Sequence, residues 1–350
     1  MRVKLKDITK FSKGTQINGK NLIDDGAYSY LNGGINPSGK WNEFNVSENT
    51  VTISEGGNSS GYVNYMNDAF WCGAHCYYLY DGPKNSKYLY YALKSQQERL
   101  FRIRSGACMP NIKKSDLGNF IIEYEKDEVR QEEVVKVLEK CELLIEDYNK
   151  KLTLLDEAVR ARFVEMFGDP VINSCQFPVQ PMTDICDIID GDRGKNYPKS
   201  EEILDDGYCL FLNAKNVTQK GFDFENCNFI TREKDDALRN GKLSRGDVVL
   251  TTRGTVGNLA YYSKNVPYEN IRINSGMVIL RMNRSILNEI YFIELFKMKL
   301  SDIKEKIASG SAQPQLPIST MNKIILMIPP LELQNQFASF VQEIDKSGFD

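Results

Sequence analysis

The segment IRSGACMPNIKKSDLGNFI, residues 103–121, returns without a gap as IASGSAQPQLPISTMNKII, residues 307–325. Six of the 19 aligned positions are identical, far more than unrelated segments share, and self-similarity over a long period indicates a duplicated structural unit. The identical positions in the first segment are Ile103, Ser105, Gly106, Pro110, Ser115 and Ile121. The chain is therefore predicted to contain two diverged copies of one module.

Weaker matches extend the repeat toward the start of each copy. Asp7–Gly14 aligns with Asp184–Gly191, and Val51–Ser54 aligns with Val249–Thr252. Both Val51–Ser54 and Val249–Thr252 are followed by a glycine-rich loop. The distance between matching segments grows along the chain only through insertions in loops, where insertions are best tolerated. Two copies of one fold account for this pattern.

Each copy is predicted to be a mixed module of short strands and turns, followed by a helix, a turn and a last strand. The fold class is α+β, with two homologous mixed α/β domains separated by a long heptad helix and with a short second helix at the C-terminus. The corresponding elements are helices Tyr88–Arg102 and Glu289–Ala308, turns Ser105–Gly106 and Ser309–Gly310, and strands Phe120–Tyr124 and Ile324–Ile328.

A long helix is predicted between the copies, because glycine and proline are absent from Asp127 for 40 residues. Asp127 is a suitable N-cap, and Gly168 followed by Pro170 is a suitable end. At 1.5 Å per residue the helix is about 60 Å long. Its apolar residues follow the 4-3 spacing of a heptad seam: Val134, Leu138, Cys141, Ile145, Tyr148, Leu152, Leu155 and Val159.

An apolar stripe on a charged helix needs a partner. The seam by itself fits a homo-oligomeric coiled coil as well as a partner helix within the chain. The repeat points instead to the segment after Pro329–Pro330, where Phe337, Val341 and Ile344 repeat the seam spacing. This second helix, lying antiparallel to the first, would cover only part of the seam.

Composition limits the function classes. The net charge is −3, but residues 127–167 hold 11 acidic and 7 basic side chains, so the two modules are close to neutral.

The first eleven residues alternate lysine with apolar residues, so neither a signal peptide nor a membrane span is expected. The location is expected to be cytoplasmic, with free thiols. The eight cysteines form no CxxC pair and His75, the only histidine, is expected to pack in a core, so no metal site is expected.

No catalytic motif is found: neither a phosphate-binding loop of the form GxxxxGK[ST] nor an Asn-Pro-Pro-Tyr or Asp-Pro-Pro-Tyr motif for amino methylation is present. Two modules with heptad helices, together with Leu154–Val159 (LLDEAV) and Phe163–Pro170 (FVEMFGDP), resemble the specificity subunits of Type I restriction-modification systems. The resemblance covers nearly the whole chain. It departs at the C-terminus, where a second helix of full length would be expected.

The resemblance implies a DNA-specificity subunit that is not an enzyme and holds no cofactor. Residues 1–126 and 170–330 would be target recognition domains, each reading half of a bipartite site in double-stranded DNA. Residues 127–169 would be the spacer helix and residues 331–350 the start of a second one. The helices would set the spacing and dock modification (methyltransferase) subunits and, through them, the restriction subunit; a second specificity chain is an open alternative for the uncovered seam.

Direct reading of DNA needs Arg or Lys for guanine, Asn or Gln for adenine, and small hydroxyls for phosphates. Equivalent loops of the two copies have this composition, although each residue alone is also typical of a solvated turn. Arg253 is the strongest single candidate. The candidates are Lys10, Lys13, Gln16, Asn18, Asn32, Asn36, Lys40, Asn58, Ser59 and Ser60 in the first copy, and Arg193, Lys195, Asn196, Asn213, Lys215, Asn216, Thr252, Arg253, Thr255 and Asn258 in the second.

Two other classes of function stay open. A coiled-coil scaffold that binds other proteins would explain the helix and its acidity but leaves the polar loops unexplained. A methyltransferase or nuclease with its own active site is disfavoured by the missing motifs.

Overall fold

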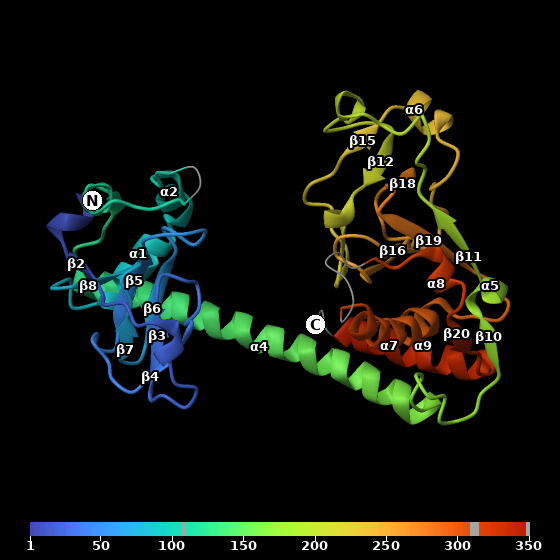
Figure 1. Ribbon diagram of the computed structural model, residues 1–350, viewed down its shortest axis with the longest axis horizontal. Coiled ribbons are helices and arrows are strands. Elements are labelled where there is room, and N and C mark those ends of the chain that lie inside the picture. Colours follow the sequence, from blue (N-terminus) through green and yellow to red (C-terminus); the bar gives the residue numbers. More distant parts are fainter. Residues whose placement is uncertain (107–108, 309–314, 348–350) are drawn as a thin grey trace. The chain divides into compact units, whose positions relative to one another are not determined.

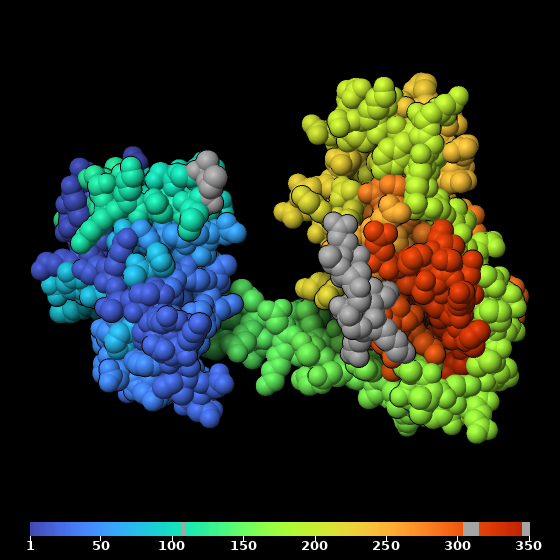
Figure 2. All heavy atoms as spheres, viewed as in Figure 1, coloured from blue at the N-terminus to red at the C-terminus, as the bar shows by residue number. Residues whose placement is uncertain are grey.

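The computed structural model describes residues 1–106, 109–308 and 315–347. The chain forms two compact units, Met1–Tyr148 and Asn149–Asp350, and the long helix α4 (Glu128–Phe167) contributes to both (Figure 1). Each unit is filled by consecutive parts of the chain, blue to green in the first and green to red in the second (Figure 2). The predicted turn at Ser309–Gly310 lies outside the described residues.

Unit 1 begins with short strands and continues through three helices and the last strand, β9, before α4. Its strands are β1 Arg2–Lys4, β2 Lys10–Lys13, β3 Tyr28–Leu31, β4 Gly39–Trp41, β5 Thr50–Ser54, β6 Val63–Met66, β7 Phe70–Cys72, β8 Cys76–Tyr80 and β9 Ile121–Glu123. Its helices before α4 are α1 Ser86–Lys94, α2 Gln97–Arg102 and α3 Lys114–Gly118.

Unit 2 follows a similar order, with two short helices among its strands and the 20-residue α7 where unit 1 has α1 and α2. Its strands are β10 Val179–Pro181, β11 Cys186–Asp190, β12 Cys209–Leu212, β13 Val217–Thr218, β14 Gly221–Phe222, β15 Phe229–Ile230, β16 Val248–Thr251, β17 Leu259–Tyr261, β18 Ile271–Ile273, β19 Met277–Met282 and β20 Ile325–Met327. Its helices after α4 are α5 Met182–Ile185, α6 Arg232–Ala237, α7 Glu289–Ala308, α8 Ile318–Met321 and α9 Leu331–Ser347.

The sheets show the duplication directly. The four-stranded antiparallel order β2-β8-β5-β6 of unit 1 returns as β11-β19-β16-β17 in unit 2, and the two-stranded pair β1-β9 returns as β10-β20. The three-stranded order β4-β3-β7 returns as β15-β12-β18, with one antiparallel and one parallel pair in each. The predicted pair of homologous mixed modules is confirmed, and the hairpin β13-β14 is an addition to the second.

The register of the glycine-rich loops differs from the sequence alignment by one residue. Ile53 pairs with Tyr77 in unit 1, and Leu250 pairs with Val278 at the same place in unit 2. Glu55 is thus equivalent to Thr252, because their carbonyl groups accept the backbone N–H of Ile112 and Leu316 at 2.9 and 3.0 Å. Four-residue strands of similar composition align equally well in two registers, whereas backbone pairing admits one.

The predicted helix Tyr88–Arg102 is wrong in its continuity, because the chain breaks between α1 and α2. Ser95 ends α1, and its hydroxyl donates to the carbonyl of Ala92 at 3.0 Å. The side chain of Gln97 then accepts a hydrogen bond from Val63 N, in β6, at 3.0 Å and donates to Gly61 O, just before β6, at 2.6 Å. These bonds fix the start of α2 on the sheet. The equivalent predicted helix Glu289–Ala308 is confirmed as α7.

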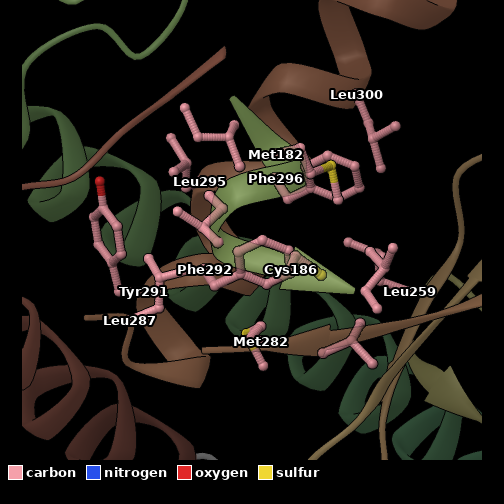
Figure 3. Close-up of a cluster of buried hydrophobic side chains, with 14 of the residues drawn as sticks. Met182, Cys186, Leu259, Met282, Leu287, Tyr291, Phe292, Leu295, Phe296 and Leu300 are labelled. Carbon is pink, nitrogen blue, oxygen red and sulfur yellow. The ribbon is translucent and has the colours of Figure 1, made fainter. Parts of the chain in front are cut away.

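The core of unit 2 that positions the four-stranded sheet lies against α7. Figure 3 shows Tyr291, Phe292 and Phe296 of this helix packed with Met182 of α5 and Cys186 of β11. All five are buried, and burying one such side chain contributes about 1.5–3 kcal/mol. The smaller core of unit 1 is built in the same way from the sheet and α1.

Helix α4 begins and ends as predicted. Asp127 accepts the backbone N–H of Val129 at 2.9 Å, and Gly168 adopts a left-handed φ of +73° after the last turn. Within unit 1, Gln131 is buried and donates to Tyr124 and to the carbonyl of Glu125 at 3.1 and 2.6 Å. The side of α4 that packs on unit 1 is therefore the face of Gln131 rather than the seam.

Most of the predicted seam is uncovered. Val134, Cys141, Ile145, Tyr148 and Leu152 are exposed, whereas Leu138 and Leu155 are half-buried. Only Val159 is buried, as part of the unit 2 core. The packing is supplied by other positions near the end of α4, above all Phe163 and Phe167.

The predicted second helix is α9, which packs on α4 within unit 2. The ring centroid of Phe337 lies 5.4 Å from that of Phe163 and 5.6 Å from that of Phe167. The guanidinium of Arg162 lies 5.7 Å from the ring centroid of Phe340. Figure 1 shows α9 running antiparallel to this end of α4. Helix α9 has 17 residues and α4 has 40.

Candidate nucleic-acid interface

A surface hollow of ≈550 Å³ opens at one end of the four-stranded sheet of unit 1. It lies where β2 and β5 end and β8 begins, and the turn before α3 closes it. Lys13 Nζ donates to Glu55 Oε1 at 2.7 Å across the hollow. Its lining residues are Lys13, Glu55, Tyr77, Asn111, Lys113 and Lys114.

Tyr77 forms the floor of this hollow. Its ring is buried, and its hydroxyl donates to the carbonyl of Ile112 at 3.1 Å. Burial, and then the negative charge of Glu55, raises the pKa of Tyr77 to about 12, so the hydroxyl remains a donor. His75 was expected in a core but is exposed, with Nδ1 3.4 Å from Glu55 Oε2, because it lies in the turn before β8.

Unit 2 has a hollow of ≈210 Å³ where β11 and β16 end. The guanidinium of Arg193 lies 3.1 Å from the carboxylate of Asp190, and the backbone of Arg253 bridges to that of Gln315. Within the part of the chain that the structure describes, the Arg253 guanidinium makes no hydrogen bond or ion pair. The lining residues are Asp190, Arg193, Thr252, Arg253, Val278, Gln315, Leu316, Pro317 and Ile318.

The two hollows occupy the same place in the duplicated fold. Lys13 pairs with Tyr77 across β2 and β8, and Asp190 pairs with Val278 across β11 and β19. Every residue that lines the first hollow has an equivalent lining the second. The equivalent pairs are Lys13 and Asp190, Glu55 and Thr252, Tyr77 and Val278, Asn111 and Gln315, Lys113 and Pro317, and Lys114 and Ile318.

The loop that carries Arg193 is held by its neighbour Asp192. This buried carboxylate accepts the backbone N–H of Gly194 and of Arg239, each at 2.7 Å. These two bonds, with help from the Arg239 guanidinium, lower the pKa of Asp192 to about 2. Asp192 is thus ionised throughout the physiological range, which keeps the loop in place beside the hollow.

Of the predicted contact residues, the structure brings Lys13 into the first hollow, and Arg193, Thr252 and Arg253 into the second. The other exposed candidates lie on loops and strand edges around the units. These are Lys10, Gln16, Asn18, Asn36, Lys40 and Asn58 in unit 1, and Lys195, Lys215 and Thr255 in unit 2.

Several candidates serve the local structure of a loop. Asn18 and Asn213 accept the backbone N–H of Lys20 and Lys215 as caps of short 3₁₀ helices. Four others each make one such contact. Lys10 forms an ion pair with Asp81, and the side chain of Asn32 accepts the backbone N–H of His75. Ser59 donates to the carbonyl of Gly33, and Asn196 donates to that of Ala237.

Four predicted contact residues have buried side chains that bond inward. Ser60, Asn216, Thr252 and Asn258 are 0%, 1%, 5% and 6% exposed. Ser60 donates to the carbonyl of Glu55, and Asn216 donates to those of Asp223 and Asn226. Thr252 donates to the carbonyl of Gly276, and Asn258 donates to that of Val217. These bonds hold the loops together.

The contact residues predicted from the sequence do not include the turn of the repeat itself. Asn111, Lys113, Lys114 and Gln315 lie in the segments 103–121 and 307–325, which served only to identify the duplication. The signal was an amide residue at the same aligned position in both copies, followed in the first by two consecutive lysines. Nothing in the linear sequence places these residues beside β2 or β11.

The described residues offer no sign of other site chemistry. No three or more of the described His, Cys, Asp and Glu side chains form a group that could hold a metal ion, and the described cysteines carry free thiols. No helix within residues 1–106, 109–308 and 315–347 is long and apolar enough to span a membrane.

Comparison with known proteins adds an independent line of evidence. The family model of the Type I restriction modification DNA specificity domain matches residues 1–155 and 177–349. A putative type I specificity subunit of Mycoplasma genitalium is 28% identical over 95% of this chain and 84% of its own. One of Mycoplasma pneumoniae is 26% identical over 98% and 88%.

A solved structure gives the same result for the fold. The crystal structure of a Type I restriction-modification system S subunit from M. genitalium superposes with a TM-score of 0.62 at 22% identity. The match covers 99% of this chain and 90% of that one. At this identity the likeness concerns the fold.

Proposed function

The chain belongs to the family of Type I restriction modification DNA specificity domains, and from that premise we propose that it is the DNA-specificity subunit of a Type I restriction-modification complex. It has no catalytic role of its own. Residues 1–126 and 170–330 are its target recognition domains, and each reads one half of a bipartite site in double-stranded DNA. The family membership does not favour the alternative of a scaffold that binds only proteins.

One observation carries this proposal. The same three sheets occur twice, and each copy presents an equivalent hollow lined by different polar and charged side chains. A constant frame with different side chains is what two readers of different half-sites require, because base edges are distinguished by the donors and acceptors that face them.

The helices supply the second part of the function. Residues 127–169 are a spacer that fixes the distance between half-sites, and residues 331–350 are the start of a second one. Modification subunits dock on these helices and bring the restriction subunit with them, and adenine methylation and cleavage belong to those chains. The complex works on cytoplasmic DNA. The exposed seam residues Val134, Cys141, Ile145 and Leu152 offer a surface for a modification subunit or a second specificity chain.

The test uses the full chain co-expressed with its modification subunits. The complex is expected to be stable, to methylate DNA, and to enrich a split target from duplexes of random sequence. Its affinity is expected to fall steeply as salt rises, because phosphate contacts release counterions. Equal recovery of every sequence would refute the specificity function. A stable complex that neither binds nor methylates DNA would favour the scaffold.

A further inference from the structure

The two hollows have one chemical feature in common besides their position. Each is lined by an uncharged amide side chain, Asn111 in unit 1 and Gln315 in unit 2, at equivalent places in the repeat. Every other equivalent pair of lining residues differs in charge or polarity. An amide kept in both copies, amid side chains that have diverged, points to a contact that both half-sites share.

The backbone holds each amide residue in place. Asn111 exchanges two backbone hydrogen bonds with Ser105, at 2.8 and 2.9 Å, and the next residue bonds to the carbonyl of Glu55. Gln315 pairs with Arg253, and the next residue bonds to the carbonyl of Thr252. A reading side chain on a fixed backbone loses little freedom when it binds, so its geometry selects between bases.

The amide groups themselves are available for a ligand. Both residues are exposed. Asn111 Oδ1 accepts one hydrogen bond, from Ser105 Oγ at 3.2 Å, which leaves a lone pair. Among the described residues neither amide NH₂ group donates a hydrogen bond. Each amide can therefore offer one donor and one acceptor at the same time.

Positive charge lies beside each amide. Lys113 and Lys114 line the hollow of unit 1 with Asn111, and Arg193 and Arg253 line that of unit 2 with Gln315. Lysine beside a base-reading group suits the phosphates on either side of the base, and arginine suits a phosphate or the edge of a neighbouring guanine. The surroundings of both amides suit a DNA groove.

Of the four bases, adenine matches an amide side chain with two bonds, because it presents the N7 acceptor beside the N6 donor in the major groove. Guanine presents two acceptors there, and cytosine presents a donor alone. We propose that Asn111 and Gln315 are equivalent specificity-determining residues, each of which reads one adenine at a corresponding position of its half-site. This inference rests on the proposed function.

The test replaces each amide by the carboxylate of the same shape, N111D and Q315E, in the full chain assembled with its modification subunits. The change removes the donor to N7 and keeps the volume. Sequences selected from a library of random duplexes are compared for their bases. The wild-type complex is expected to enrich adenine at one position in each half-site. N111D is expected to lose this enrichment in one half, and Q315E in the other, by about 5- to 150-fold, the range that one bidentate pair contributes.

Two sets of variants control for folding and charge. Asn111→Gln and Gln315→Asn keep an amide and are expected to keep the adenine. Gln219→Glu makes the same change on an exposed residue of the turn between β13 and β14, which has no counterpart in unit 1, and is expected to leave both half-sites unchanged.

The outcomes separate this inference from the function it rests on. Unchanged adenine enrichment in N111D and Q315E, with a specific wild-type complex, overturns the inference alone. The same holds if one variant alters both half-sites. A wild-type complex without any preferred sequence overturns the proposed function itself.

Discussion

Unit 1 places Lys13, Lys113 and Lys114 around its hollow, whereas unit 2 places Arg193 and Arg253 around the equivalent one. The frame beneath them is the same, down to the paired strands and the backbone bonds after β5 and β16. A lysine ammonium is a point charge that suits phosphates, whereas the planar arginine fork matches the edge of guanine. We therefore expect unit 1 to draw affinity from its lysines and unit 2 to draw base preference from its arginines.

The units also differ in what completes their cores. Unit 2 buries Phe337 of α9 against Phe163 and Phe167, whereas unit 1 has no aromatic residue of α4 in its core. Phe337→Ala is therefore expected to destabilise unit 2 by about 3–5 kcal/mol, the cost of a cavity left by a buried phenylalanine. Urea unfolding is expected to show an earlier transition for unit 2 and an unchanged one for unit 1.

The control for this variant is Leu154→Ala, on the exposed side of α4. It is expected to change stability by about 0.5 kcal/mol or less, as exposed substitutions do. A comparable loss in both variants, or a loss in both units from Phe337→Ala, would contradict the assignment of α9 to the core of unit 2.

Acid is expected to loosen the loop of Arg193, since unit 2 holds it with Asp192. The pKa of Asp192 is lowered in the folded chain to about 2, so its contribution is present above the unfolded value near pH 4 and is lost as pH falls through the folded value. The shift corresponds to about 2 kcal/mol at neutral pH, of which about half is gone by pH 3.

Asp192→Asn tests this contribution. The free energy of unfolding, measured in urea, is expected to fall by about 2 kcal/mol at pH 7 and by roughly half as much at pH 3. A difference between variant and wild type that stays constant from pH 7 to pH 3 would show that the charge of Asp192 is not what holds the loop.

Base preference in unit 2 is expected to depend on Arg253, whose guanidinium has no partner among the described residues. Arg253→Ala is expected to cost about 1–3 kcal/mol of discrimination at one base pair in one half-site. Selection from random duplexes measures this loss. A change in both halves would refute the assignment of one half-site to each unit.

The lysines of unit 1 are expected to act without regard to sequence. The double variant Lys113→Ala, Lys114→Ala is expected to weaken binding to all duplexes alike and to lower the slope of log K against log salt by about 2, one for each phosphate contact. Affinities measured at several salt concentrations give the slope. An unchanged slope with a changed base preference would reverse the roles assigned to lysines and arginines.

The sequence predicted the frame better than the surface. The heptad spacing and the caps at Asp127 and Gly168 located α4 closely, because helix ends obey local rules. The break between α1 and α2 was missed, since it depends on Gln97 reaching strand β6, which lies far away in sequence. Long-range contacts of this kind leave no local signal.

In the candidate site too, local sequence signals found some residues, and residues placed by long-range contacts were missed. Loop composition found Arg193 and Arg253, whose side chains line one hollow. It also suggested Asn216 and Asn258, because buried asparagines that tie loops together look the same in sequence as exposed ones that read bases. Asn111 and Gln315 were missed, since only the pairing of strands brings the repeat turn to the end of the sheet.

The central claim is that two copies of one module read two half-sites across a fixed spacing. The most direct measurement is a map of methylated adenines in the host genome, with and without this gene. The account predicts one bipartite motif, with two specific blocks separated by a constant gap, whose methylation disappears with the gene. A continuous motif, or a methylation pattern that is unchanged without the gene, would contradict it.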